Sequence, residues 1–113
     1  MADTIFGKIV AGEIPADKIY EDDLCIAIND INPQAPVHVL IIPKKPIEKL
    51  SDAGGDDQPL LGHLLLTVAK LAEQLGVADG YRTIINNGAN GGQTIFHLHV
   101  HLIAGYKMRE GMV

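Results

Sequence analysis

The sequence predicts an α+β fold with a mainly antiparallel sheet. The expected elements run in the order helix, strands, helix, strands, and the regular strand–helix alternation of a doubly wound parallel sheet is missing. The chain has 113 residues, of which 47% are hydrophobic and 20% are charged. This length and composition suit one hydrophobic core, so we expect a single domain over residues 1–113.

A short helix is expected first. Asp3 or Thr4 can cap its N-terminus, the apolar side chains that follow share one side, and Gly12 suits its C-terminal end. Two short strands, Lys18–Glu21 and Cys25–Asn29, then flank an acidic turn. The later elements are expected as a stiff loop at 32–36, strands at 38–42, 82–86 and 94–105, a polar loop at 51–59 and a glycine-rich loop at 87–93.

The strongest helical pattern covers Leu60–Leu75, where apolar residues recur at i, i+3, i+4 and i+7. The expected core-facing stripe consists of Leu61, Leu64, Leu65, Val68, Leu71, Ala72 and Leu75, and the opposite, polar face consists of His63, Thr67, Lys70 and Gln74. Pro59 suits its first position, and Gly76 suits the position just after its end. Leu66 and Ala69 fall outside the core-facing stripe, so the apolar surface is wider than one core needs. We expect a second copy to cover the surplus, which predicts a homodimer.

Charge and cysteine content argue against several classes of protein. Fourteen acidic residues against nine basic ones give a net charge of −5, the opposite of a typical nucleic-acid binder. No apolar run is long enough to span a membrane, and the N-terminus lacks the features of a secretory signal. Cys25 is the only cysteine, which argues against a disulfide and a cysteine-based zinc site. We therefore expect a cytoplasmic protein without nucleic-acid or membrane partners.

Three of the five histidines lie in one stretch, His97-Leu98-His99-Val100-His101-Leu102-Ile103. Because side chains alternate along a strand, the three imidazoles are expected on one face and the apolar residues on the other. Imidazoles can act as nucleophiles and proton carriers near pH 7, can bind zinc, or can neutralise phosphate. A solvated polar face is the alternative, but three histidines in register favour function.

Other polar residues are candidates to support the histidines. His38 begins the second histidine-bearing strand, and the last residues of the glycine-rich loop can hold an anion. Thr94 reaches the histidines only if the chain bends after that loop. Asp30 can hold a ribose diol or cap a turn, and Asn86 can donate to a phosphate. His63 is interpreted as an ordinary surface residue.

The histidine run looks like the histidine-triad signature, His-φ-His-φ-His-φ-φ, where φ is apolar. Segments 3–9, 14–16, 20–23, 30–38, 42–45 and 80–94 resemble the Hint branch of that family, so the resemblance covers residues 3–105. It implies a homodimer whose subunits each contain a five-stranded antiparallel sheet and two helices. It also implies a nucleoside phosphoramidase that hydrolyses aminoacyl adenylates as well, acting on purine mononucleotide derivatives without a metal or other cofactor.

The resemblance also implies residue roles. His99 corresponds to the nucleophile, and Thr94 stands where the branch usually has a serine near the leaving group. The implied supporting histidines are His97, His101 and His38. The implied nucleotide contacts are Asn86, Gly92, Gln93, Thr94, His99 and His101 around the phosphate, Asp30 at the ribose, Ile31 beside the base, and Ile5, Phe6, Ile9 and Ile28 around the purine. The branch commonly ends in Trp-Pro-Pro-Gly, whereas residues 106–113 here contain no tryptophan.

Three alternatives to the phosphoramidase remain. A dinucleoside polyphosphate hydrolase of the fragile-histidine-triad branch is less favoured, because that branch usually has glutamine where Asn86 stands and Leu-Pro-Arg where this chain has Leu102–Gly105. A zinc protein would use the three triad histidines or His38 as ligands. A nucleotide sensor with weak catalysis would use the same pocket.

Overall fold

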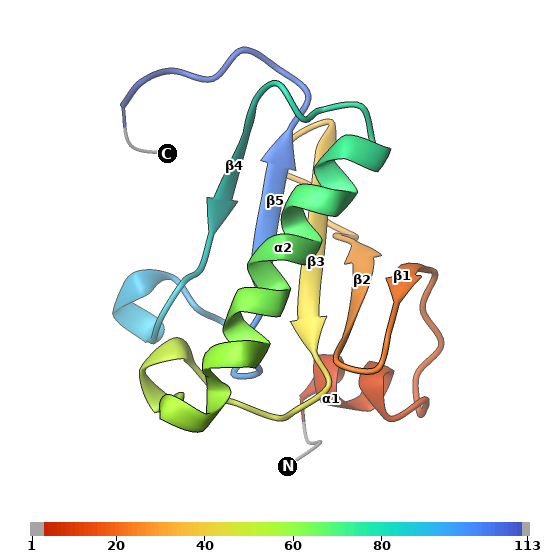
Figure 1. Cartoon of the computed structure of the whole chain (residues 1–113), viewed down its shortest axis with the longest axis vertical. Helices are drawn as coiled ribbons and strands as arrows, with labels where there is room; N and C mark the ends of the chain where they lie inside the picture. The colour runs from red at the N-terminus through yellow and green to blue at the C-terminus, as the bar shows by residue number, and fades with distance from the viewer. Residues whose placement is uncertain (1–3, 112–113) are drawn as a thin grey trace.

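A single antiparallel sheet forms the centre of the molecule (Figure 1). The computed structural model describes residues 4–111, and its five strands lie in the order β1-β2-β3-β5-β4, with each neighbouring pair antiparallel. The strands are β1 (Lys18–Glu21), β2 (Cys25–Asn29), β3 (Val37–Pro43), β4 (Tyr81–Ile84) and β5 (Val100–Ala104). With two α-helices, α1 (Ile5–Val10) and α2 (Gln58–Gln74), this confirms the predicted α+β class.

The two helices pack on opposite faces of the sheet. Along β2, Ala27 joins the apolar cluster that includes α2, whereas Ile26 and Ile28 join the cluster that includes α1. Alternating residues of β3 divide between the clusters in the same way. Both central strands are therefore covered on both sides, which is why their sequences are almost continuously apolar.

The helix ends follow the predicted chemistry. The Thr4 hydroxyl accepts a hydrogen bond from the Gly7 N–H at 3.0 Å, which identifies Thr4 as the cap of α1, while Asp3 lies outside the described residues. At the C-terminal end of α2, Gly76 adopts a φ of +77°, and the Val77 N–H donates to the Ala72 carbonyl. This is the left-handed glycine termination predicted for that helix.

Three boundaries differ from the prediction. The last strand begins at Val100 rather than Thr94, because the Leu98 N–H donates to the Ile47 carbonyl at 2.7 Å and holds the preceding chain outside the ladder. β4 ends at Ile84, earlier than the expected end at Asn86. The polar loop over 51–59 contains parts of two 3₁₀ turns, Leu50–Asp52 and Gly55–Asp57.

Helix α2 is rotated slightly from the predicted orientation. Leu65, expected toward the core, is 50% exposed, and Thr67, expected on the polar face, is 3% exposed. Thr67 tolerates burial because its hydroxyl donates to the His63 carbonyl at 2.8 Å. Leu66 is 73% exposed, in agreement with the prediction that it lies outside the core-facing stripe. Within residues 4–111, no helix is both long and apolar enough to cross a membrane.

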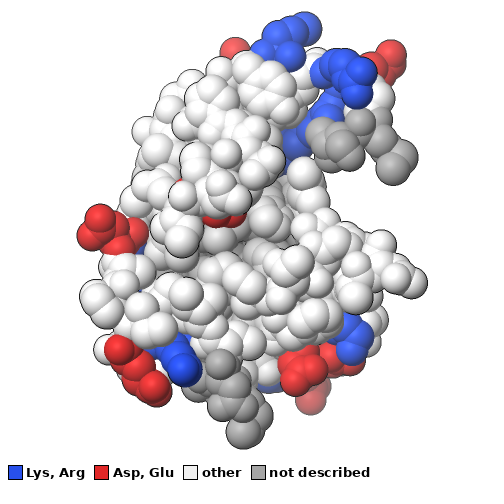
Figure 2. Space-filling model, turned by 180° about the vertical axis from the view of Figure 1, so that it is seen from behind, with Lys and Arg blue, Asp and Glu red and all other residues white. Residues whose placement is uncertain are grey.

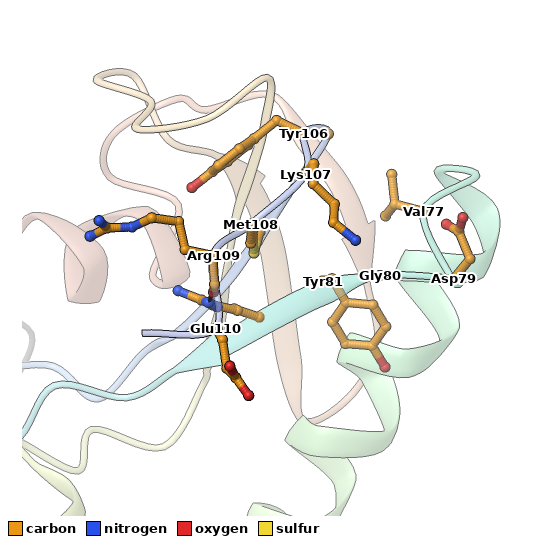
Figure 3. A pocket seen from close by; sticks show the side chains of 11 residues that line it. Val77, Asp79, Gly80, Tyr81, Tyr106, Lys107, Met108, Arg109 and Glu110 are labelled. Atoms are coloured by element: carbon orange, nitrogen blue, oxygen red, sulfur yellow. Dashed lines mark hydrogen bonds between the residues drawn. The ribbon is translucent and has the colours of Figure 1, made fainter. Parts of the chain in front are cut away.

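The segment after β5 leaves the sheet and returns past β4 (Figure 1). The Arg82 guanidinium donates to the Arg109 carbonyl, and a hollow of about 850 Å³ is lined by Val77 and residues 79–82 and 105–110 (Figure 3). Gly105 starts this segment with a φ of +102°. A Cβ atom there would lie 2.8 Å from the Pro36 Cβ, so both the backbone and the available space require glycine.

Two glycine substitutions should have opposite effects on stability. Gly105→Ala should lower the free energy of unfolding by roughly 1–3 kcal/mol, because alanine is strained at this φ and collides with Pro36. Gly62→Ala should raise it by roughly 0.5–1 kcal/mol, because Gly62 lies within α2 with open space around it. Urea unfolding at one protein concentration measures both, and a change of the same sign in the two variants would contradict these roles.

Candidate active site

Three imidazoles meet on the face of the sheet that carries α1. His38 lies in β3, His101 lies beside it in β5, and His99 immediately precedes β5. The ring centroids of His38 and His101 are 5.2 Å apart, and those of His99 and His101 are 5.0 Å apart. Phe6 of α1 presents a T-shaped contact to the His99 ring at 4.9 Å. The antiparallel pairing of β3 with β5 thus brings His38 and His101 together, although they are 63 positions apart in the sequence.

Hydrogen bonds determine which nitrogen carries the proton in two of these rings. The Gln34 backbone N–H donates to His38 Nδ1 at 3.0 Å, so a neutral His38 carries its proton on Nε2. That Nε2 lies 2.9 Å from His101 Nδ1 and donates to it, which leaves the His101 proton on Nε2. His101 Nε2 is buried and has no partner among the described residues. It is a donor available to a bound molecule.

Asp30 stands at the start of this chain of imidazoles. Its Oδ1 accepts from the Asn32 N–H at 2.8 Å, so the turn-capping role is present. Its Oδ2 lies 3.4 Å from His38 Nε2, so a carboxylate stands beside that ring. The side chain is 20% exposed, so the carboxylate is also accessible from solvent.

His99 has the opposite tautomer. Its Nδ1 lies 2.8 Å from the His97 carbonyl oxygen, which can only accept, so Nδ1 carries the proton and Nε2 has a free electron pair. Burial lowers the pKa of His99, which keeps the ring neutral near pH 7. The structure therefore places a neutral imidazole with an unprotonated Nε2 next to the donor ring of His101.

Burial also determines the charge of His101. Burial, together with repulsion from positive charge on His99 and His38, lowers the pKa of His101 to about 4. Burial likewise lowers the pKa of His97. Near pH 7, His97, His99 and His101 are thus neutral imidazoles, and hydrogen bonds determine which nitrogen of His99 carries the proton.

His97 does not continue the row of imidazoles as the strand alternation predicts. Its Nε2 donates to the Pro43 carbonyl at 2.7 Å, and its side chain is almost fully buried. The regular alternation begins only at Val100, so His97 lies in the irregular chain that precedes the strand. It anchors that chain to the end of β3 while its own carbonyl orients His99.

The glycine-rich loop is closed by its own hydrogen bonds. The N–H groups of Gly91, Gly92 and Gln93 donate to carbonyls of Gly88 and Ala89. The Gln93 side chain is buried, accepts from the Gly88 N–H and donates to the Glu48 and Ile95 carbonyls. These hydrogen bonds brace the loop, and the phosphate contacts expected of Gly92 and Gln93 stay a prediction.

The other predicted nucleotide contacts differ in accessibility. Phe6, Ile9 and Ile28 are buried in the core, so a base could reach only their edges. Ile5, in the helix that covers the imidazole face, is 45% exposed, and Ile31, in the loop after β2, is 96% exposed. Asn86 is half-buried after β4, and Thr94 is exposed at the end of the glycine-rich loop. Figure 2 shows that this side of the molecule is hollowed, with Lys and Arg side chains at the upper edge of the hollow and mainly uncharged residues elsewhere around it.

A family model for the HIT domain matches residues 11–108. The chain belongs to the HIT family. An uncharacterized HIT-like protein of Synechococcus elongatus is 62% identical to it over 103 residues, which cover 91% of this chain and 90% of that protein. The family assignment confirms the predicted histidine-triad resemblance.

Solved structures of HIT proteins share the whole fold. A HIT family hydrolase from Clostridium thermocellum superposes with a TM-score of 0.95 and 44% identity, covering 100% of this chain and 99% of that one. A histidine triad nucleotide-binding protein from Candida albicans gives a TM-score of 0.81 and 33% identity, covering 98% and 86%. This chain thus has the fold of HIT family hydrolases.

The lowered histidine pKa values should make this HIT protein less stable in mild acid. Unfolded histidine titrates near 6.5 and His101 near 4, so between these values the unfolded chain binds the extra proton. Stability should be fully present above about pH 6.5 and decrease as the pH falls, with His101 contributing up to about 1.4 kcal/mol per pH unit.

Urea unfolding of the wild type and His101→Asn across this range measures the effect. The difference in unfolding free energy between the two proteins should change with pH. The titration of the carboxylates is common to both proteins and cancels in this difference, so the remaining change reports His101. A constant difference would show that His101 is not buried in its neutral form.

Proposed function

We propose that this protein hydrolyses derivatives of purine nucleoside 5′-monophosphates in which the α-phosphate is joined to an amine or an acyl group. His99 is the nucleophile. The hydrogen bond from His99 Nδ1 to the His97 carbonyl carries the proposal, because it leaves the Nε2 electron pair available at neutral pH. The hydrolase and nucleotide-binding names of the structural neighbours agree with this class of substrate.

The reaction proceeds in two displacements at phosphorus. His99 Nε2 forms a bond to the α-phosphorus, the bond from phosphorus to the leaving amine breaks, and the amine takes up a proton. Water then attacks the nucleotidyl-His99, its proton is released, and the bond from Nε2 to phosphorus breaks to give the mononucleotide. Holding the ring and the phosphate in line removes much of the entropic barrier.

His101 stabilises the charge that develops on the phosphate. Its Nε2–H is buried and unpartnered in the described structure, and a phosphate oxygen would satisfy it. As that oxygen gains charge, His38 and Asp30 stabilise partial positive charge along the imidazoles. Asn86 is a further donor, and Thr94 is placed near the leaving group by the family resemblance.

The nucleoside is held by the residues around this centre. The Asp30 carboxylate accepts from the ribose hydroxyls, while Ile31 and Ile5 cover the purine with their exposed side chains. Phe6, Ile9 and Ile28 form the buried floor of the pocket. These contacts bind the substrate and its transition state alike, so they act mainly on KM.

A covalent intermediate should be detectable on His99. A slow phosphorothioate substrate, quenched early, should give a nucleotidylated peptide that contains residues 96–102. Two in-line displacements should also retain the configuration at phosphorus. His99→Ala should abolish the adduct and reduce turnover by at least about 1,000-fold.

His63→Ala is the matched control, since His63 lies on the other face of the sheet. It should leave adduct formation and turnover unchanged. Inversion at phosphorus, or substantial turnover by His99→Ala, would exclude the nucleophilic mechanism. Parallel assays of adenosine phosphoramidates, aminoacyl adenylates and dinucleoside polyphosphates identify the leaving group, and absence of turnover on all three would favour nucleotide sensing.

We also propose that the protein works as a homodimer through the exposed side of α2. Leu65 and Leu66 are 50% and 73% exposed, and Ala69 continues the same apolar surface one turn on. An apolar helix face of this kind is stabilised when a second copy covers it.

Light scattering should give twice the 12.1 kDa chain mass at micromolar concentration. Leu66→Glu should shift the mass toward the monomer by placing a charge in the apolar contact. The exposed substitution Lys70→Glu on the same helix is its control and should leave the mass unchanged. A monomeric wild type would contradict the proposal.

A further inference from the structure

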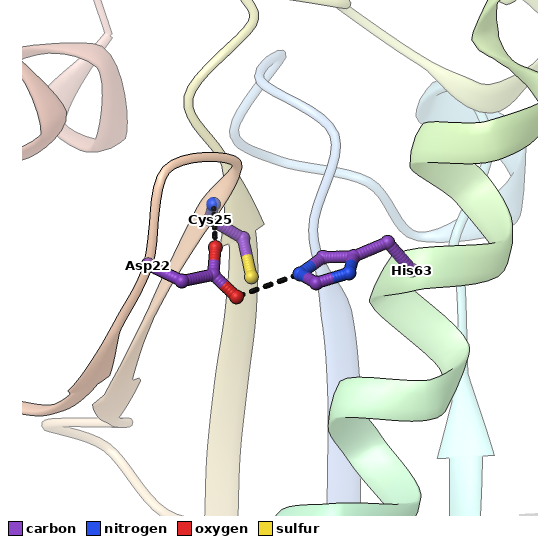
Figure 4. Close-up of side chains that lie close together, drawn as sticks. All are labelled: Asp22, Cys25 and His63. Atoms are coloured by element: carbon purple, nitrogen blue, oxygen red, sulfur yellow. Dashed lines mark hydrogen bonds and ion pairs between the residues drawn. The ribbon is translucent and has the colours of Figure 1, made fainter.

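A second cluster of reactive side chains lies on the α2 face of the sheet, opposite the imidazoles. Asp22 comes from the turn after β1, Cys25 opens β2, and His63 projects from α2 (Figure 4). One carboxylate oxygen, the thiol sulfur and one ring nitrogen all lie within 4.8 Å of one another. This contradicts the expectation that His63 is an ordinary surface residue.

The Asp22 carboxylate is held in place independently of His63. Its Oδ1 accepts from the N–H groups of Leu24 and Cys25 at 2.8 and 2.9 Å, and its Oδ2 accepts from the Tyr20 hydroxyl at 2.7 Å. His63 Nε2 lies 2.6 Å from the same Oδ2. Burial alone raises the pKa of Asp22, but these hydrogen bonds hold it well below its usual value, so the group is a carboxylate.

Cys25 directs a sulfur toward these two groups (Figure 4). The residue is fully buried, and its nearest polar contact is a weak one, 3.9 Å from the sulfur to the Thr67 hydroxyl. Burial raises the pKa of the thiol to about 11, so it keeps its proton unless a cation replaces it. The side chains of Asp22 and His63 are 24% and 34% exposed, which gives an ion access from solvent.

We propose that Asp22, Cys25 and His63 form a binding site for Zn²⁺. Zinc prefers thiolate, imidazole and carboxylate ligands in tetrahedral geometry, and three protein ligands leave the fourth position to water. The bond from sulfur to zinc forms as the thiol releases its proton to solvent. His63 Nε2 exchanges its hydrogen bond with Asp22 for a bond to zinc, and its ring proton lies on Nδ1.

This site would join the β1–β2 hairpin to α2, so bound zinc would stabilise the contact between them. It is independent of the proposed hydrolysis, since the sheet separates it from the imidazoles. From the sequence we expected neither a metal nor a cysteine-based zinc site, because we assumed that such a site needs several cysteines. That expectation overlooks a ligand set with one cysteine, whose members are distant in sequence.

Cobalt is the probe that distinguishes this site from the only other candidate cluster among the described residues, Asp30, His38 and His101. That cluster contains no sulfur. A thiolate bound to Co²⁺ gives a near-ultraviolet charge-transfer band, and Cys25 is the only cysteine in the chain. Such a band therefore reports Cys25 directly.

Reduced, metal-free full-length protein should bind one Co²⁺ with this band and with the visible bands of tetrahedral cobalt, and Zn²⁺ should displace it. Cys25→Ser should remove the charge-transfer band, and His63→Gln should weaken Co²⁺ binding at least about 100-fold. Tyr20→Phe, which removes a donor to Asp22, should weaken it by about tenfold. His101→Gln is the matched control and should leave the band unchanged.

A tenfold excess of Zn²⁺ over its Kd should also raise the Tm of the wild type and not that of His63→Gln. Absence of the charge-transfer band in the wild type would overturn the proposal. Co²⁺ binding that survives His63→Gln and is lost in His101→Gln would place the metal among the imidazoles instead. If Cys25→Ser does not fold, the wild-type band and the His63→Gln titration still decide the outcome.

Discussion

The antiparallel pairing of β3 with β5 is the contact on which the site depends. This register places Leu40 opposite His101 and His38 opposite Ile103, and so brings the two rings to a 2.9 Å contact. β3 contributes to the apolar clusters on both faces of the sheet, and Val100 and Leu102 of β5 belong to the cluster that contains α2. A shift by one residue would therefore turn apolar side chains to the wrong face. The hydrophobic core thus fixes the geometry of a polar site that it does not contain.

Backbone groups then determine the tautomers of the histidines that the strand pairing brings together. The Gln34 N–H fixes the His38 tautomer, and the His97 carbonyl fixes the opposite tautomer in His99. The outcome is a free electron pair on one ring beside a free N–H on another, and among residues 4–111 no ion pair involves His99. Asp30 contributes at the end of the chain of imidazoles, where its carboxylate remains accessible.

Much of this arrangement could be predicted from the sequence because it follows from local patterns. Alternation placed Leu98, Val100 and Leu102 in the core, and cap chemistry located both ends of α1 and the C-terminal end of α2, which itself begins two residues earlier than expected, at Gln58. The gathering of His38, His99 and His101 was expected from their strands and from the family resemblance. The family itself was evident from the triad signature, and the match to the HIT domain confirmed it.

The remaining features depend on contacts between distant segments, which periodicity does not report. The Leu98 bond to Ile47 delays the last strand, and the Pro43 carbonyl draws His97 out of the row. The Gln93 amide braces its loop through the Glu48 carbonyl, which lies 45 residues earlier. His63 was interpreted as surface because it lies on the polar face of the helix, and that pattern does not report its contact with Asp22, 41 residues earlier.

The alternation along β2 has a consequence for how this protein can change during evolution or design. Cys25 and Ala27 face α2, whereas Ile26 and Ile28 face α1 and the pocket floor. Adjacent residues of β2 therefore pack on opposite faces of the sheet, and a substitution at one of them changes the packing on one face only. Libraries restricted to odd or to even positions of this strand would sample the two faces almost independently, so substrate selectivity and scaffold robustness could be tuned as separate traits.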